Sequence, residues 1–358
     1  MAKKKKETIH IEVNSYDTFA ADFHKEFGED ILRDADQLEN PLPNFSGSHI
    51  LDIDLSIPMP EGRIIEIFGA EGSGKTTVGL EILGQAQSRG KRVLYVNAEE
   101  NLDRSLVDGI RTLDPAAVDE DGNKTFQIIQ FVNGTAENYL NAVEKFLSSF
   151  RNTVCLVDSV DALIPESVLA GDYGDSNMGN MGKFMSTAMR RIKGICACTK
   201  STIIFTNQWR KKMDPFGDPR VTPGGEALKF YASQRVRFEA IGKSQQLMSE
   251  DKDRVIGHQV RYYVVKNKAA PPFIDNSFPI IYGMGIYREY EIAKLIKDLG
   301  VAETSGQGGC YIHIGDNKYT TDKLAGLFVS DPDLYKTYVD KINNIYFNTA
   351  EKDEVQEA

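Results

Sequence analysis

The stretch FGAEGSGKTT, residues 68–77, decides the fold of this chain. It fits the pattern G-x-x-x-x-G-K-[ST], and the residues that define the pattern are Gly69, Gly74, Lys75 and Thr76. Glycines let a backbone wrap around a phosphate, and N–H groups at the start of the following helix face the anion. Lys75 supplies positive charge to the β- and γ-phosphates, and the Thr76 hydroxyl suits Mg²⁺. The stretch therefore predicts a nucleoside triphosphate site, completed by Glu71, Gly72, Ser73 and Thr77.

Two carboxylates are candidates to complete this site. The apolar segment VCLVDS contains Asp158, in the pattern of the aspartate that holds the metal of a P-loop protein. Glu99 follows the segment LYVNA, where a carboxylate can orient a water molecule for attack on the γ-phosphate. Acids at strand ends are commonly capping residues, and the residues alone favour neither role for Glu99. Together with the loop, Asp158 and Thr76 are predicted to be the metal ligands.

Strand and helix signals alternate from about residue 50 to about residue 290. Several candidate strands are continuous apolar runs, which is typical of strands that helices cover on both faces. The candidates are RIIEIF (63–68), RVLYVNA (92–98), TVCLVDS (153–159), TIIFTNQ (202–208), RVRFEAI (235–241) and VRYYVVK (260–266). The alternation predicts an α/β fold with a mostly parallel central sheet, and the phosphate loop at residues 68–77 makes this domain the core of a P-loop ATPase.

The remaining segments predict smaller parts. Phe19, Phe23 and Phe27 recur at helical spacing near the N-terminus, and the proline-containing ENPLPNFSGS then reads as a linker. Near the C-terminus, YEIAKLIKDLGV and LYKTYVDKINNIYF predict amphipathic helices around a β-like piece. We expect an N-terminal helix and linker (1–48), the core (49–288), a small C-terminal α+β domain (289–348) and an acidic disordered tail (349–358).

Composition bounds the class of protein. The 358 residues are 41% hydrophobic and 26% charged, which is typical of a soluble folded protein. No apolar run reaches the ~18 residues of a membrane span, and the lysine-rich N-terminus lacks the apolar part of a signal peptide, so we expect a cytoplasmic protein.

The net charge of −10 is mild evidence against nucleic acid as a partner. Without a histidine cluster nearby, reduced thiols rather than a zinc site are predicted for Cys155, Cys196, Cys198 and Cys310.

Longer segments carry a more specific signal. The most specific are residues 171–194 and 205–238, GDYGDSNMGNMGKFMSTAMRRIKG and FTNQWRKKMDPFGDPRVTPGGEALKFYASQRVRF, together with VDSVDALIP and YVVKNKAAPPF. In this order they resemble the RecA family of bacterial-type or phage-encoded recombinases, from about residue 17 to about residue 348. The resemblance implies a homologous recombinase that uses ATP and Mg²⁺ to polymerise on single-stranded DNA as a helical filament. Such a protein pairs that strand with homologous double-stranded DNA, and its ATP hydrolysis is DNA-stimulated. Single-strand-binding and loader proteins are further candidate partners.

The resemblance also implies roles for single residues. It makes Glu99 the activator of the attacking water and Gln208 the sensor of the γ-phosphate, and it brings Asp103 near the nucleoside. Lys266 and Lys268, in VVKNK, match residues that reach the γ-phosphate held by the neighbouring subunit, as an arginine finger does. Tyr282 resembles a residue that packs on the neighbour's adenine, and the N-terminal helix resembles the element that docks on the next subunit.

Two DNA-binding loops follow from the resemblance, at about residues 170–179 and 209–224. The second is basic and contains Arg210, Lys211, Lys212 and Arg220. Gly224 and Gly225 expose backbone N–H groups to a phosphate, and Lys183, Ser186 and Arg190 occupy phosphate-contact positions. Met178 and Met213 are apolar side chains that can wedge between bases. A basic loop is usually only a solvated one, and here the resemblance favours DNA.

Three positions depart from the family pattern. Leu106 stands where close relatives stack a tyrosine on the adenine, Trp209 replaces an aliphatic residue, and Glu226 stands where the family often has asparagine. Two other functions share the phosphate loop: a hexameric, helicase-like motor on the same core, and a filament protein that binds ATP without hydrolysing it. The motor need not contain VVKNKAAPPF, and an intact set of Glu99, Gln208 and the two lysines argues against the inert filament.

Overall fold

The computed structural model describes residues 15–28, 32, 35–170, 180–211, 220–240, 246–249, 251 and 253–347. The chain forms two compact units, Met1–Pro41 and Leu42–Ala358. The first contains the helix α1 (Tyr16–Phe27) and the short turn η1 (Ala35–Gln37). The Ser15 hydroxyl accepts the Thr18 N–H at the start of α1, and Gly28, with a φ of 105°, ends it. The predicted helix is confirmed, and it ends at Phe27.

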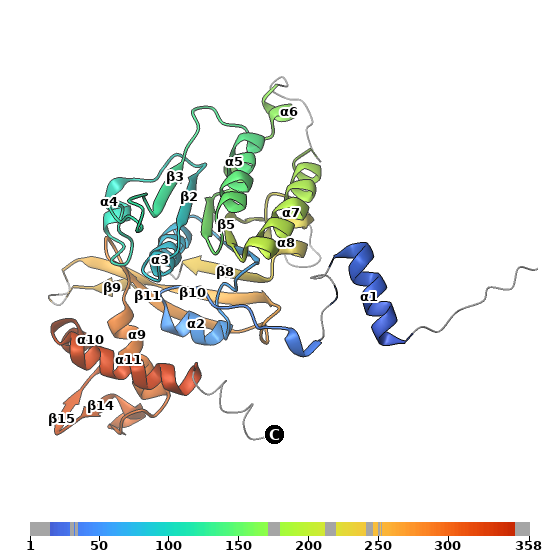
Figure 1. Cartoon of the computed structure of the whole chain (residues 1–358). Helices are drawn as coiled ribbons and strands as arrows, with labels where there is room; N and C mark the ends of the chain where they lie inside the picture. The colour runs from blue at the N-terminus through green and yellow to red at the C-terminus, as the bar shows by residue number, and fades with distance from the viewer. Residues whose placement is uncertain are drawn as a thin grey trace, which may run out of the picture. The chain divides into compact units, whose positions relative to one another are not determined.

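A large sheet organises the second unit, with strand order β12-β11-β10-β8-β1-β5-β4-β2-β3 and β9 paired to β10 (Figure 1). The strands from β8 to β3 along this order are parallel, whereas β10, β11 and β12 add an antiparallel extension. The strand bounds are β1 (Ile64–Gly69), β2 (Val93–Asn97), β3 (Phe126–Ile129), β4 (Val154–Asp158), β5 (Thr202–Gln208), β8 (Gln234–Ala240), β9 (Gln246–Met248), β10 (Val255–Asn267), β11 (Asp275–Ile281) and β12 (Gly285–Ile286). The predicted mostly parallel α/β sheet is confirmed.

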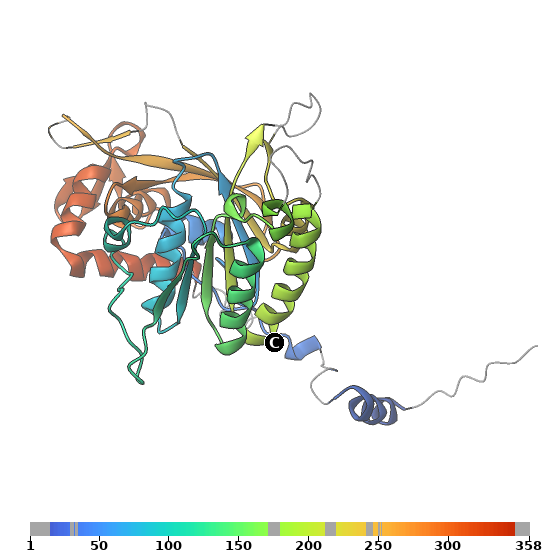
Figure 2. The ribbon, with the colours of Figure 1, turned by 90° about the horizontal axis from the view of Figure 1, so that it is seen from above.

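Helices cover both faces of this sheet, and Figure 2 shows the two layers from above. One apolar cluster joins the sheet to α2 (His49–Leu55), α3 (Lys75–Gln87) and α9 (Arg288–Asp298). A second cluster on the other face joins it to α5 (Ala136–Ser149), α7 (Asn180–Thr199) and α8 (Glu226–Tyr231). Burial on both faces explains why the central strands read as continuous apolar runs. Short helices α4 (Arg104–Asp108), η2 (Val160–Ala162) and α6 (Glu166–Leu169) lie in the connections.

The C-terminal elements belong to the same compact unit as the core. A small sheet of β13 (Thr304–Ser305), β14 (Tyr311–Ile314) and β15 (Asn317–Tyr319) accompanies η4 (Gln307–Gly309), α10 (Thr321–Ser330) and α11 (Pro332–Tyr346). Ile296 of α9 and Phe328 of α10 are buried in the cluster that also contains the α3 residues. A boundary at residue 288 stays a prediction, and the tail lies outside the described residues. Among those described, no helix is both long and apolar enough to span a membrane.

Candidate functional site

The phosphate loop connects β1, at the centre of the sheet, to α3. A Cβ at Gly69 would lie 2.2 Å from the Phe238 carbonyl oxygen of the paired strand β8, so only glycine fits there. Gly72 and Gly74 have φ values of 69° and 87°, which favour glycine. The predicted strand–loop–helix context is confirmed, and it aims the first N–H groups of α3 into the loop.

Lys75 is folded back onto this loop. Its Nζ donates to the carbonyl oxygens of Gly69 at 3.3 Å and Ala70 at 2.8 Å. The residue is only 8% exposed, and burial lowers the pKa of Lys75, while Asp158 and Glu99 act in the opposite direction. The ammonium group therefore bonds to neutral carbonyl groups, which a phosphate can replace.

Asp158, at the end of β4, is held by three hydroxyl groups. Thr76 Oγ1 and the Tyr95 hydroxyl both donate to its Oδ2 at 2.8 Å, and Thr206 Oγ1 donates to its Oδ1 at 2.5 Å. Thr76 is the second residue of α3, whereas Tyr95 and Thr206 lie in β2 and β5. The structure thus brings together the two predicted metal ligands, Thr76 and Asp158. The sequence reasoning missed Tyr95 and Thr206, because both read as ordinary members of buried strands.

Glu99 lies beside the same segment. The Ser159 hydroxyl donates to its Oε1, and Asn101 Nδ2 donates to its Oε2 at 3.0 Å. The N–H groups of Ala98 and Glu99 both donate to the Asp158 carbonyl oxygen, at 2.9 and 3.1 Å. Backbone and side chain together fix a half-buried carboxylate next to the predicted metal ligand, which suits the orientation of a water molecule.

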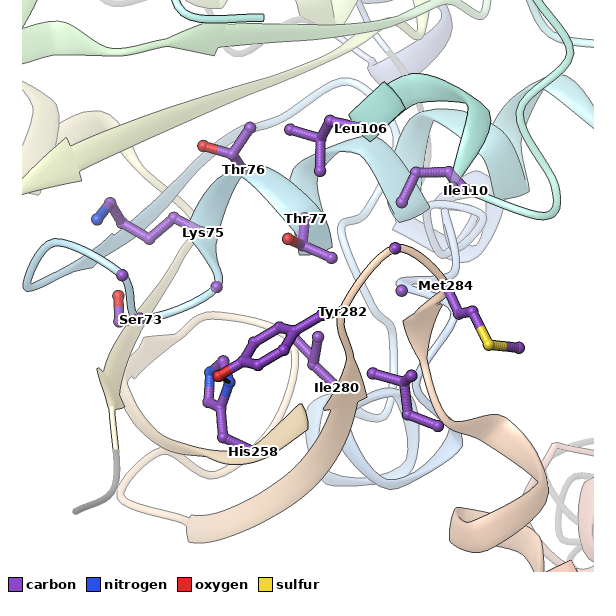
Figure 3. Close-up of a pocket in the computed structure, with 16 residues that line it drawn as sticks. Ser73, Lys75, Thr76, Thr77, Leu106, Ile110, His258, Ile280, Tyr282 and Met284 are labelled. Carbon is purple, nitrogen blue, oxygen red and sulfur yellow. Dashed lines mark hydrogen bonds between the residues drawn. The ribbon is translucent and has the colours of Figure 1, made fainter. Parts of the chain in front are cut away.

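A pocket of about 320 Å³ adjoins the loop (Figure 3). On one side it is lined by residues of the loop and of α3, on another by Leu106 and Ile110, and on a third by Ile280, Tyr282 and Met284. The Tyr282 hydroxyl lies 3.1 Å from His258 Nδ1, and burial lowers the pKa of His258. Tyr282 therefore lines the pocket of this chain's own phosphate loop, and its expected contact with an adenine stays a prediction.

Two predicted nucleotide residues lie near the pocket without lining it. Asp103 is the exposed N-cap residue of α4, three positions before Leu106. Glu71 is exposed on the loop itself. Neither makes a contact that identifies its role, so both stay predictions.

Gln208 is the last residue of β5 and pairs in register with Gly69. Directly after it come half-buried Trp209 and a two-stranded ribbon, β6 (Arg210–Lys211) and β7 (Arg220–Val221). Arg210 Nη2 donates to both carboxylate oxygens of Asp161, each at 3.0 Å. The segment that follows Asp158, a predicted metal ligand, is thus joined to the stem of the second predicted DNA loop.

Among the other predicted DNA residues, two groups lie in the described part of the chain, one on α7 and one before α8. Lys183, Ser186 and Arg190 are exposed and share one face of α7 because they are three and four positions apart. Gly224 and Gly225, with φ values of 88° and 73°, precede α8, and a Cβ at Gly225 would lie 3.3 Å from the Gly182 Cα at the start of α7. Lys211 lies in β6 and Glu226 begins α8, whereas Met178, Lys212 and Met213 lie outside the described residues.

Lys266 and Lys268 lie beside the N-terminal ends of the parallel strands, whereas the phosphate loop follows the C-terminal end of β1. Figure 1 shows β8 and β10 running in opposite directions, and Asn267 pairs with Gln234 at the start of β8. Gln234 in turn pairs with Ile65, four residues before Gly69, which is roughly 13 Å along a strand. Lys266 Nζ donates to the carbonyl oxygens of Lys229 and Phe230 at 2.7 and 3.0 Å, and Lys268 is exposed. A lysine side chain cannot cross that span to the loop of its own chain.

Comparison with known proteins gives a consistent result. The sequence model of the RecA N-terminal domain matches residues 17–287. Protein RecA 2 of Myxococcus xanthus is 42% identical over 263 residues, which cover 73% of this chain and 69% of that protein. Protein RecA of Streptococcus mutans is 35% identical over 370 aligned residues, which cover 100% and 92%. The crystal structure of the RadB recombinase matches with a TM-score of 0.50 at 19% identity, over 68% of this chain and 98% of that chain, and supports the fold alone.

Proposed function

This chain belongs to the RecA family, and from that membership we propose that it is an ATP-dependent recombinase that assembles on single-stranded DNA and exchanges strands with a homologous duplex. ATP hydrolysis would be stimulated by the DNA. The observation that carries the proposal is the position of Gln208, paired with Gly69 of the phosphate loop and followed at once by the ribbon that leads into the second DNA loop. Only Gln208 and Trp209 separate the end of the phosphate-loop strand pair from the ribbon, so the presence of a γ-phosphate beside Gln208 would be transmitted directly to the DNA-binding segment.

The loop residues fit ATP with Mg²⁺. The hydrogen bonds of Lys75 go to loop carbonyls that a triphosphate can replace, and a pocket of about 320 Å³ continues from the loop. Thr76 and Asp158 would hold the cation, which neutralises charge on the β- and γ-phosphates. Glu99 would orient the attacking water from its fixed position beside Ser159.

The base would lie against Tyr282 and Leu106 of the same chain. Both residues line the pocket that continues from the phosphate loop. An aromatic ring on one side and an aliphatic side chain on the other offer apolar contact but only one stacking surface. We therefore expect that the base contributes less to affinity here than it would between two aromatic rings. Asp103 remains a candidate contact to the nucleoside.

Each ATP site would be completed by the neighbouring subunit. Lys266 and Lys268 lie at the opposite ends of the strands from their own phosphate loop, and this distance supports a role at a neighbour's γ-phosphate. The helix α1 supports assembly, since none of its residues is buried and Phe19 and Phe27 are 46% and 51% exposed. An exposed aromatic face on a short helix is suited to dock on another subunit.

The DNA path would follow the ribbon β6–β7 and the exposed face of α7. Arg210, Lys183 and Arg190 bring cationic side chains to that side, and the glycine pair before α8 offers backbone N–H groups. Local basic residues of this kind explain how a chain of net charge −10 can bind DNA. The helicase-like motor is not favoured, because the family match extends over the N-terminal element and the whole core.

Electron microscopy tests this proposal most directly. With single-stranded DNA and a slowly hydrolysed ATP analogue, we expect an open helical filament that does not form without nucleotide. A closed ring would indicate the motor instead. The absence of any DNA-bound assembly, with folded protein, would contradict the recombinase.

A further inference from the structure

Asp158 lies on the middle one of three neighbouring parallel strands. In the sheet, β4 has β2 on one side and β5 on the other. Tyr95 pairs with Leu156, and Asn97 pairs with Asp158, so the Tyr95 side chain shares the α3 face with Asp158. Val157 pairs with Phe205, which brings Thr206 level with Asp158 on the opposite side. Each flanking strand therefore carries one hydroxyl group beside the carboxylate.

Both carboxylate oxygens are engaged from these two sides. Tyr95 donates to Oδ2 at 2.8 Å and Thr206 donates to Oδ1 at 2.5 Å. Tyr95 and Thr206 are 0% exposed, and Asp158 is 2% exposed. A phenol or hydroxyl group can donate a hydrogen bond, whereas an ionised carboxylate only accepts, so Tyr95 and Thr206 are the donors of these two bonds.

We propose that Tyr95 and Thr206 are positioning residues that hold Asp158 in the orientation required to receive Mg²⁺ together with Thr76. Neither residue reaches the nucleotide pocket, so they act through Asp158 and are not catalytic residues. This inference rests on the proposed function, because it takes ATP with Mg²⁺ as the ligand.

Fixing a carboxylate in this way has a physical benefit. A ligand whose orientation is set by hydrogen bonds meets the cation without first losing rotational freedom, and loss of such outer partners typically weakens metal binding by ~10- to 100-fold. Thr76 also donates to Oδ2 at 2.8 Å, and its oxygen keeps lone pairs for a cation while its own proton points at Asp158. The hydroxyls from β2 and β5 thus fix both carboxylate oxygens of Asp158 beside the Thr76 hydroxyl.

The test is the Mg²⁺ dependence of nucleotide binding, followed with a fluorescent, slowly hydrolysed ATP analogue. Tyr95→Phe and Thr206→Val should each raise the free Mg²⁺ concentration at half-maximal binding by about tenfold. Binding in excess EDTA should stay at the wild-type level, because it depends on Lys75 and the loop. Thr206→Ser keeps the hydroxyl and should restore the wild-type midpoint.

Two control variants remove buried hydroxyl groups elsewhere. Tyr139 donates to the Phe131 carbonyl oxygen at 3.3 Å, and Thr202, at the other end of β5 from Thr206, donates to the Pro60 carbonyl oxygen at 3.2 Å. Tyr139→Phe and Thr202→Val should lower the melting temperature without moving the Mg²⁺ midpoint.

The outcomes separate this inference from the proposed function. If wild-type binding depends on Mg²⁺ but Tyr95→Phe and Thr206→Val keep the wild-type midpoint, the two hydroxyls are only structural and the inference is wrong. If the wild type binds the analogue equally well with and without Mg²⁺, the proposed cofactor and this inference are both overturned. If Thr206→Ser shifts the midpoint as far as Thr206→Val does, the effect belongs to packing, and the positioning role is again excluded.

Discussion

Replacing Glu291 by glutamine should remove much of the stability loss that we expect when the pH rises from about 7 to about 9. Glu291 lies in α9 with no exposed surface, and it accepts hydrogen bonds from the Ser48 hydroxyl and the His49 N–H. Burial raises the pKa of Glu291 to about 8, and burial raises the pKa of Asp52, in α2, to about 7. Both acids keep protons in the folded state at pH values where the unfolded chain has lost them.

The sign and size of the effect follow from these values. A raised pKa stabilises the folded state below the unfolded value, and that stability is lost as the pH rises through the folded value. For Glu291 this window runs from 4.5 to about 8. The slope is at most ~1.4 kcal/mol per pH unit, so partial titration between about pH 7 and about pH 9 costs roughly 1.5 kcal/mol. Burial lowers the pKa of His49 to about 4, so His49 is already neutral and adds nothing in this range.

Melting temperatures at the two pH values test this reasoning. A loss of roughly 1.5 kcal/mol corresponds to a decrease of a few degrees in a unit of this size. The decrease should be smaller by about that amount in Glu291→Gln, and unchanged in Glu303→Gln, which removes an exposed carboxyl group of the same C-terminal region. If wild type and Glu291→Gln lose the same number of degrees, Glu291 does not control the pH dependence and the reasoning is refuted.

Three further predictions concern the site. Glu99→Gln should bind ATP normally but hydrolyse it ~10²- to 10⁴-fold more slowly in a phosphate-release assay, and a wild-type rate would exclude the water-orienting role. Lys75→Ala and Lys268→Ala should each be nearly inactive, yet ATPase activity should return when they are mixed on single-stranded DNA, since roughly a quarter of random interfaces join two intact halves. No recovery from co-assembled subunits would contradict a shared site. Asp161→Asn should tighten binding of labelled single-stranded DNA by up to about fivefold, because Arg210 is released from an exposed ion pair, and equal affinities would show that the pair does not compete with DNA.

The fold was largely accessible from the sequence because its central strands are long, apolar and buried on both faces. The prediction for β5 matches its bounds, and β1, β2, β4 and β8 differ from prediction by about one residue. Strands at and near the two edges of the sheet were missed, among them β3 and β11. Phe126–Ile129 is short and half-exposed, and Asp275–Ile281 contains Pro279, which local rules exclude from a strand interior. β10 also begins at Val255, five residues before its predicted start.

The candidate site was only partly accessible for a different reason. Residues within one motif, such as Lys75 and Thr76, are fixed by local spacing, whereas contacts between strands depend on sheet order. Nothing local indicates that β4 lies between β2 and β5, so the contacts of Tyr95 and Thr206 with Asp158 could not be read from the sequence. In the same way, only the antiparallel pairing of β10 with β8 shows that Lys268 lies far from its own loop.

The placement of Lys266 and Lys268 across the sheet from their own phosphate loop has a consequence for short assemblies. A row of subunits in which each completes its neighbour's site always has one more subunit than complete sites. In such a row the subunit at one end would be idle, and a lone subunit would hydrolyse no ATP. Activity per subunit should therefore climb with the length of the DNA strand and level off once many subunits fit. The free protein in solution would not hydrolyse ATP, because an isolated subunit lacks the lysines of a neighbour. ATP consumption would therefore begin with assembly and need no separate inhibitor.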